Sequence, residues 1–103
     1  MTGKELQRIL LNKWGKSYDI RLRKIGGRLF LQIMWKYLEQ GSFPVSEREY
    51  IEHLDDISLH LNAWGGKSQI EAYLKETKHS PRMGKVVNVP IDLGGRAAEW
   101  ILT

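Results

Sequence analysis

The sequence has no cysteine and only three prolines among its 103 residues. The lack of cysteine excludes disulfide scaffolds, zinc ribbons, iron–sulfur clusters and thiol nucleophiles. No stretch approaches the roughly 20 consecutive apolar residues of a membrane span. Charged residues also interrupt the apolar ones near the N-terminus, where a secretory signal needs an unbroken apolar run. We therefore expect one domain over residues 1–103, without a membrane span and stabilised by packing alone.

Acidic residues are scarce in the first part of the chain and concentrated in its middle. Residues 1–40 carry nine Lys or Arg and three acids, whereas residues 41–66 carry one Arg and five acids. The whole chain has a net charge of +4. This polarity suits an acidic partner, either a protein or a nucleic acid. It is equally compatible with solubility or with contacts between segments of the chain.

Three segments have the apolar spacing of amphipathic helices. Each begins at a Ser or Thr that is followed three residues later by Glu, the capping-box pattern, in which both side chains satisfy backbone N–H groups. The predicted helices cover residues 3–14 after Thr2, residues 46–64 from Ser46, and residues 68–77 from Ser68.

Between the first two helices, apolar and polar residues alternate on both sides of Gly26 and Gly27. A Gly-Gly pair suits a tight hairpin turn because both residues can take positive φ. The predicted cross-strand partners are Leu22 with Leu31, Ile20 with Ile33, and Tyr18 with Trp35. This register puts these apolar side chains on one face, and a one-residue slip would destroy the match. Residues 31–38 also fit a helix, but the cross-strand agreement favours a strand to about residue 35.

A third strand is predicted by the alternation of Val87, Val89 and Ile91, and Pro90 confines it to a sheet edge or a strand end. Residues 96–102 can add a final helical turn. These elements predict an α+β fold, with a small, mainly antiparallel sheet made of the hairpin and the third strand. Three to four helices should pack on one face of that sheet.

Two Gly-Lys-Ser tripeptides, at residues 15–17 and 66–68, resemble part of a phosphate-binding loop. Such a loop needs another glycine five residues earlier, where this chain has Leu10 and Leu61. We interpret both tripeptides as helix ends closed by glycine, each with a Trp packed beneath the turn.

Four potential metal ligands share one stripe of the second predicted helix, at spacings of four, three and four residues. They are Glu49, His53, Asp56 and His60. We predict no specific zinc site there, because no ligand from another segment is identifiable and a solvated polar helix face gives the same pattern. The sequence has no Gly-x-Ser-x-Gly elbow of a hydrolase and no acid-x-Lys pair of a restriction-type nuclease in the hairpin. We therefore predict no enzyme activity and no cofactor.

The most interesting candidate surface is the other face of the hairpin. In the predicted register Arg21 faces Gln32 and Arg23 faces Phe30, while Arg28 and Lys36 lie at the ends. Cationic groups beside an aromatic ring on a sheet can hold phosphates while a base stacks on the ring. The same groups can receive an acidic protein, or a helix of the chain can cover them. No RNP-type string of alternating glycines and aromatic residues favours RNA specifically.

Several blocks of the sequence resemble one protein family. They are residues 13–19 (KWGKSYD), 31–40 (LQIMWKYLEQ), 42–44 (SFP) and 81–85 (PRMGK). These blocks are similar to those of a family of small proteins from cyanobacteria and plant plastids that is catalogued as a domain of unknown function. The resemblance covers nearly the whole chain and implies a soluble protein of the cyanobacterial cytoplasm or the plastid stroma. It implies no catalytic residue, and a role beside photosynthetic complexes would suit that distribution.

The sequence therefore predicts a small interaction or assembly module without enzyme activity. We expect it to bind an acidic protein through the basic hairpin face, with the Phe43-Pro44 loop as a second possible contact. The alternative is an RNA-binding protein that uses the same face, and a third hypothesis is an enzyme or metal protein centred on the second helix. The identity of the partner and the oligomeric state stay open at this point.

Overall fold

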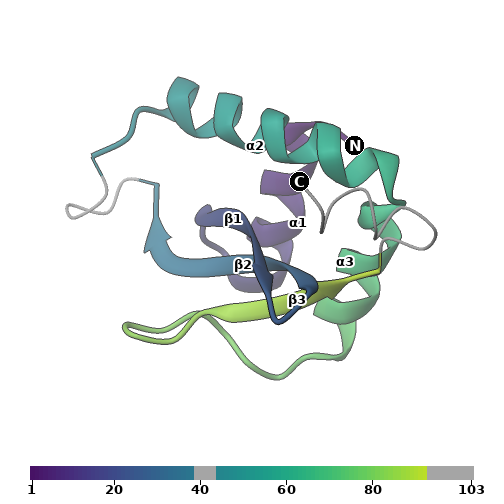
Figure 1. Cartoon of the computed structure of the whole chain (residues 1–103). Coiled ribbons are helices and arrows are strands. Elements are labelled where there is room, and N and C mark those ends of the chain that lie inside the picture. The colour runs from purple at the N-terminus through teal and green to yellow at the C-terminus, as the bar shows by residue number, and fades with distance from the viewer. Residues whose placement is uncertain (39–43, 93–103) are drawn as a thin grey trace.

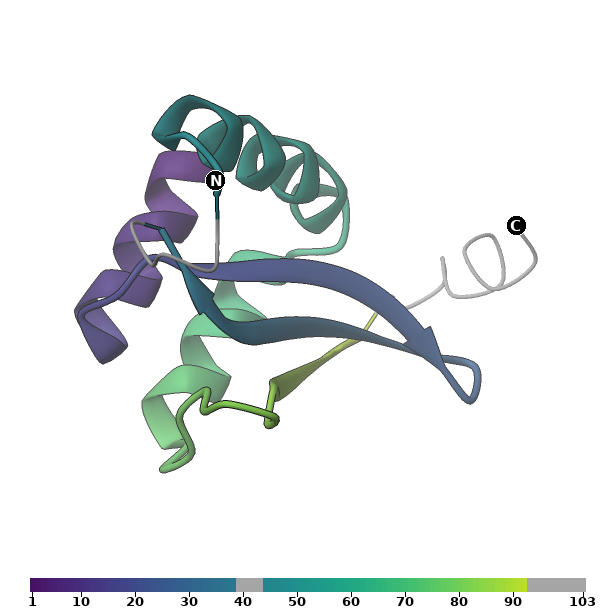
Figure 2. The same cartoon turned by 90° about the vertical axis from the view of Figure 1, so that its left-hand side faces the viewer.

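The computed structural model describes residues 1–38 and 44–92, and this part of the chain contains three helices and three strands. They are α1 (Gly3–Trp14), β1 (Tyr18–Ile25), β2 (Arg28–Tyr37), α2 (Glu47–Ala63), α3 (Gly66–Glu76) and β3 (Val87–Ile91). The strands form one antiparallel sheet in the order β1-β2-β3. The three helices all lie on one side of this sheet (Figures 1 and 2). The predicted α+β fold is confirmed, and the helical turn expected at residues 96–102 lies outside the described residues.

The first two helices begin where the local sequence predicts. The Thr2 hydroxyl accepts a hydrogen bond from the Glu5 N–H at 3.2 Å, and Ser46 forms a complete capping box with Glu49. The Glu5 carboxylate also pairs with Lys67 at 3.3 Å, and that hydrogen bond lowers the pKa of the Glu5 carboxyl. These caps satisfy backbone N–H groups that have no partner inside the helix.

The third helix begins two residues earlier than predicted. Gly65 has a φ of 66°, a conformation that glycine adopts without a steric penalty, and it leads directly from the end of α2 into Gly66. The predicted cap, Ser68, lies inside α3, and its hydroxyl donates to the Gly65 carbonyl at 3.1 Å. The capping-box interpretation of Ser68 was therefore wrong, because the backbone freedom of Gly65 removes the need for a loop there.

The glycine closure predicted for the first helix is confirmed. Gly15 has a φ of 76°, and its N–H donates to the Leu11 carbonyl at 2.8 Å. The Trp14 ring packs edge-on against Tyr18, with 5.8 Å between the ring centroids. The tripeptide at residues 15–17 is thus the end of α1 followed by the start of β1, as the helix-end interpretation predicted.

The hairpin register is confirmed over most of its length. Leu22 pairs with Leu31, Ile20 with Ile33, Arg21 with Gln32, and Arg23 with Phe30. Gly26 and Gly27 form the turn with φ values of 58° and 79°. The predicted pairing breaks down only at the far end of the hairpin, where the register shifts between Tyr18 and Ile20.

Tyr18 pairs with Tyr37, so the predicted pairing with Trp35 was wrong. Between Ile33 and Tyr37, β2 contains two residues more than β1 does over the same stretch, which is a β-bulge. The bulge brings the Tyr37 ring edge-on to Tyr18 at 5.9 Å. The Leu38 N–H donates to the Ser17 carbonyl at 2.9 Å beyond the bulge, so pairing continues past the predicted end of the strand.

The core lies between the helices and the face of the sheet that they cover, which we call the inner face. Its fully buried members include Leu6 and Leu10 of α1, Ile20 of β1, Leu31 and Ile33 of β2, Leu54 and Leu61 of α2, Ile70 of α3 and Val89 of β3. α1 approaches α2 closely at Gly3, where an added Cβ would lie 2.8 Å from the backbone nitrogen of Asp55. The Asp55 carboxylate accepts a hydrogen bond from the Gly3 N–H at 2.7 Å, so α2 also caps the start of α1.

The free edge of β1 is covered over its first half by α2. The Tyr50 hydroxyl donates to the Tyr18 carbonyl at 2.7 Å, and the His53 Nε2 lies 2.6 Å from the Ile20 carbonyl oxygen. Burial, with a contribution from the nearby Asp19 charge, raises the pKa of the Tyr50 phenol, so this group stays protonated and remains a donor. The second half of β1, toward Gly26 and Gly27, extends past the helices (Figure 2).

Candidate interaction surface

The face of the sheet turned away from the helices, here called the outer face, carries most of the predicted site residues. It is built from two neighbouring cross-strand rows, because β3 pairs with β2 in a register that continues the pairing of the hairpin. The polar row is Arg21, Gln32 and Asn88, and the apolar row is Arg23, Phe30 and Pro90. None of the three helices described by the structure covers this face (Figures 1 and 2).

The polar row is fixed by a side-chain hydrogen bond. The Gln32 amide nitrogen donates to the Asn88 side-chain oxygen at 3.0 Å. Gln32 is only 6% exposed although it lies on the outer face, because its neighbours on both strands enclose it. Gln32 is therefore a buried, hydrogen-bonded residue between Arg21 and Asn88. The sequence, in contrast, predicts an exposed residue that contacts the partner.

The apolar row places an aromatic ring between a cation and a proline. Phe30 is half-buried, and its cross-strand partners are Arg23 on one side and Pro90 on the other. Pro90 is exposed on the edge strand β3, as its missing N–H group requires. Ile25, the next residue of β1 on the outer face, is 46% exposed. The end of the outer face toward the hairpin turn thus offers apolar side chains beside Arg23.

Arg28 and Lys36 lie at opposite ends of β2. Arg28 pairs with Ile25 beside the turn and is exposed. Lys36 is also exposed, but it lies within the bulged stretch, four residues from Gln32, which is about 13 Å along a strand. The structure therefore brings Arg21, Arg23, Phe30 and Gln32 together, with Arg28 at the rim, and leaves Lys36 apart from them.

Sequence reasoning missed the contribution of β3 to this surface. Asn88 and Pro90 alternate with the buried residues Val87, Val89 and Ile91, so the alternation already placed them on the opposite face of their strand. What was lacking was the position of β3 beside β2 and its register. Because β3 pairs with β2, the outer face consists of three strands and extends beyond the hairpin.

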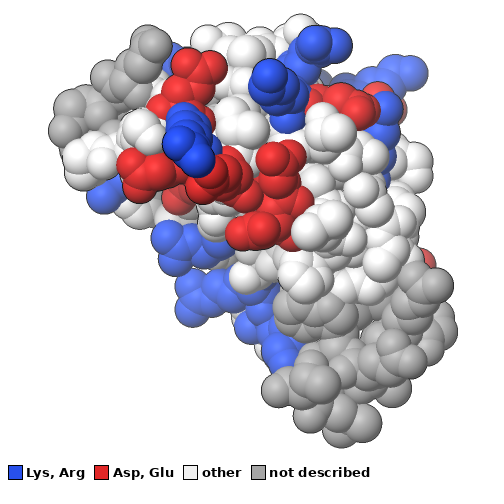
Figure 3. Space-filling model, turned by 90° about the horizontal axis from the view of Figure 1, so that it is seen from above, with Lys and Arg blue, Asp and Glu red and all other residues white. Residues whose placement is uncertain are grey.

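Acidic side chains gather on α2, although Arg48 lies among them and pairs with Glu52 at 3.2 Å. Five acids lie on α2, namely Glu47, Glu49, Glu52, Asp55 and Asp56. In the view from above, they gather over α2, and a row of basic side chains lies beside them (Figure 3). The acidic middle segment of the sequence therefore also forms an acidic region of the surface, with basic side chains beside it (Figure 3).

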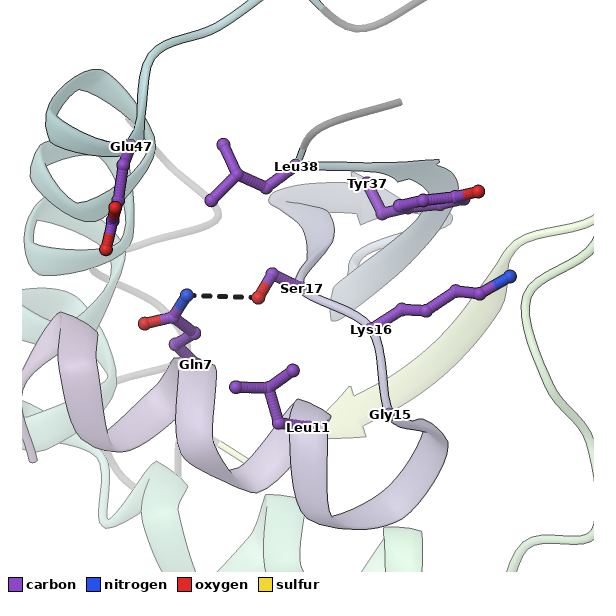
Figure 4. A pocket seen from close by; sticks show the side chains of 8 residues that line it. All are labelled: Gln7, Leu11, Gly15, Lys16, Ser17, Tyr37, Leu38 and Glu47. Atoms are coloured by element: carbon purple, nitrogen blue, oxygen red, sulfur yellow. Dashed lines mark hydrogen bonds between the residues drawn. The ribbon is translucent and has the colours of Figure 1, made fainter. Parts of the chain in front are cut away.

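A second candidate site is a hollow of about 460 Å³ between α1, the end of β2 and the start of α2 (Figure 4). Its polar lining is partly used within the chain. The Gln7 amide donates to the Ser17 hydroxyl at 3.0 Å, and Lys16 Nζ lies 4.6 Å from the centroid of the Tyr37 ring. Ser17 is thus held by an amide, which is not a base that could activate it as a nucleophile.

The stripe of possible metal ligands on α2 is partly engaged in other contacts. His53 is hydrogen-bonded to β1, with Asp19 at 3.6 Å from its Nε2, and the His60 ring stacks on Trp64 at 6.0 Å. Within residues 1–38 and 44–92, no group of three or more His, Asp or Glu side chains could hold a metal ion. Among the helices described by the structure, none has the length and apolar character needed to cross a membrane.

Comparison with known proteins gives a family and a solved structure. A family model described as "Domain of unknown function (DUF3067)" matches residues 4–101. The solution NMR structure of the Alr2454 protein from Nostoc sp. strain PCC 7120 is 54% identical in sequence and has a TM-score of 0.86. The match covers 100% of this chain and 99% of that one. No curated protein matches the chain.

Proposed function

From the premise that the chain belongs to the family described as Domain of unknown function (DUF3067), whose description assigns no activity, we propose a function on the geometry of the site. The protein is a non-enzymatic interaction or assembly module, and it binds an acidic protein partner through the outer face of its sheet. The cyanobacterial source of the similar structure fits the resemblance found in the sequence. A cytoplasmic or plastid-stromal location belongs to the same proposal.

The observation that carries this proposal is the pair Arg21 and Arg23, both exposed on the outer face of β1, which none of the described helices covers (Figures 1 and 2). Within the described ranges 1–38 and 44–92, no acidic side chain forms an ion pair with either arginine. An arginine guanidinium can hold a carboxylate through two parallel hydrogen bonds. Two such groups on one strand face therefore offer a site for two carboxylates, and the charge attracts the partner from a distance.

The surroundings of Phe30 favour a protein over RNA. A base stacks on an open ring face, whereas Phe30 is half-buried and has Arg23 and Pro90 as cross-strand partners. An aliphatic or aromatic side chain of a protein can pack on the exposed part of Phe30 and on the exposed Pro90 together. RNA binding through the same arginines is the competing hypothesis, and the experiment separates the two.

The test is capture of partners from a cyanobacterial extract, before and after nuclease treatment, with identification by mass spectrometry. We expect nuclease-resistant recovery of acidic proteins by the wild type and at least a tenfold loss with Arg21→Glu combined with Arg23→Glu. The matched control is Arg8→Glu with Lys78→Glu, which changes the net charge equally at exposed positions off the sheet. This control should recover the same proteins as the wild type.

Two results would overturn the proposal. If nuclease treatment abolishes recovery, the partner is a nucleic acid. The logarithm of the binding constant should then fall, for each tenfold rise in salt concentration, by about 0.7 for every phosphate contacted on a single strand. If both double variants lose binding equally, net charge alone drives the interaction and the outer face has no special part in it.

A further inference from the structure

Three outer-face residues of β1 follow one another at every second position. They are Arg21, Arg23 and Ile25, and β1 pairs with β2 without a register shift over this stretch. The first two are cations, and the third is one of the few large apolar side chains that the described part of the chain exposes. The strand therefore presents the order cation, cation, apolar at a constant spacing.

That spacing is about 6.8 Å, because each residue of an antiparallel strand advances about 3.4 Å. An extended polypeptide laid along β1 has the same repeat. Two of its carboxylates at positions i and i+2 can therefore meet Arg21 and Arg23 at the same time, and the side chain two positions further on then lies over Ile25.

The neighbouring strands add apolar side chains beside Ile25. Phe30 lies diagonally across from Ile25, within reach of an aromatic ring on a sheet, and Pro90 continues this apolar area on β3. At the other end, Gln32 and Asn88 are hydrogen-bonded to each other beside Arg21. Along the strands, the outer face thus changes from hydrogen-bonded amides beside Arg21 to apolar side chains beside Arg23.

We infer that the outer face recognises an extended acidic segment in which two carboxylates alternate along the chain and an apolar side chain occupies the next alternate position. The carboxylates pair with Arg21 and Arg23, and the apolar side chain packs on Ile25 and Phe30. This inference rests on the proposed function and specifies the chemistry of its partner. The apolar residue stands after the carboxylates or before them, according to the direction in which the segment runs along β1.

The test uses short synthetic peptides and the ¹H–¹⁵N spectrum of the protein. One peptide has Glu at two alternate positions, Leu at the next alternate position and Thr elsewhere, and a second has the same order reversed. A third has the same composition with the two Glu adjacent and the Leu displaced, and a fourth replaces Leu by Thr. We expect one of the first two to bind at least tenfold more tightly than the third and fourth, with shifts concentrated on β1 and β2.

Substitution of the apolar contact provides an independent measurement. Ile25→Thr should weaken binding of the best peptide about fivefold and leave the fourth peptide unaffected. The matched control is Leu59→Thr on α2, since Leu59 is 70% exposed and lies off the sheet. Both positions are exposed, so both variants should keep the native spectrum, which serves as the check on folding.

The outcomes separate this inference from the proposed function. If all four peptides bind equally, and Arg21→Glu with Arg23→Glu weakens their binding, the inferred spacing of the carboxylates is wrong. The outer face would then recognise only the negative charge of its partner. Binding that ignores Ile25→Thr would overturn the apolar contact. If none of the peptides shifts the spectrum at about millimolar concentration, the inferred motif is wrong, and the capture experiment then decides the proposed function by itself.

Discussion

The inner and outer faces of the sheet are made by the same three strands, yet they differ in almost every physical property. On the inner face Ile20, Leu31 and Val89 are fully buried. Their neighbours in the sequence, which lie on the outer face, are Arg21, Gln32 and Asn88. Arg21 and Asn88 are exposed, and Gln32 is buried. Alternation of side chains along a strand lets one face supply packing energy while the other stays free to meet a partner. We therefore expect substitutions on the outer face to change the proposed binding with little effect on stability.

The largest expected effect comes from removing an inner-face side chain. Leu31→Ala should lower the free energy of unfolding by about 2–5 kcal/mol, because it leaves a cavity in the central strand. Phe30→Ala, one residue away on the outer face, should cost clearly less since Phe30 is only half-buried. Urea denaturation of both variants gives the comparison, and equal losses would show that the two faces are not energetically distinct.

A smaller effect is expected where α2 covers the edge of β1. Tyr50→Phe removes a buried hydrogen bond to the Tyr18 carbonyl and should cost about 1–2 kcal/mol, with the unpaired carbonyl as the main cause. Thermal or urea denaturation at neutral pH measures this loss. Arg21→Ala on the exposed side of the same strand is the control and should cost much less.

Tyr50 also predicts a pH dependence. The pKa of its phenol is raised above the ordinary value of 10.0, so the folded state favours the protonated form. The stabilisation is therefore fully present below pH 10 and is lost as the pH rises above that value toward the raised pKa. The wild type should lose stability above pH 10 more steeply than Tyr50→Phe, and parallel curves would contradict the assignment.

A gain in stability is expected at Ser58 on the buried side of α2. Ser58 is 2% exposed, and its hydroxyl is the buried side-chain group without a hydrogen-bond partner among the described residues. An unsatisfied buried hydroxyl costs free energy, so Ser58→Ala should raise the free energy of unfolding by up to about 1 kcal/mol. A loss above the error of denaturant unfolding would mean that the hydroxyl has a partner in solution.

The smallest effect on folding is expected from the outer face itself. Arg21→Glu with Arg23→Glu should change the free energy of unfolding by no more than about 0.5 kcal/mol per substitution, because exposed charges contribute little to folding. The same double variant is expected to reduce recovery of the partner at least tenfold. If it unfolds, the arginines are structural and the separation between the two faces does not hold.

Local sequence determined the helices and most of the hairpin. Thr2 and Ser46 start α1 and α2 because their hydroxyls reach backbone N–H groups three residues on, which needs no tertiary contact. The turn at Gly26 and Gly27 and the pairing of Ile20 with Ile33 also follow from local rules, since only glycine takes both positive φ values freely and only one register buries the apolar residues together. The arginines of the outer face were located by the same alternation.

Tertiary structure decided the features that the alternation of apolar and polar residues does not predict. These features depend on contacts between distant segments, which the sequence of one strand or helix does not show. The bulge that pairs Tyr18 with Tyr37 occurs together with edge-on contacts of Tyr18 to the Trp14 and Tyr37 rings, which the alternation of residues does not encode. The cover on the β1 edge depends on where α2 crosses it. The burial of Gln32 depends on β3, whose Asn88 arrives from 56 residues further along the chain. The sequence by itself thus defined a basic strand. The pairing of β3 with β2 then added Asn88 and Pro90 and made that strand part of a three-stranded surface.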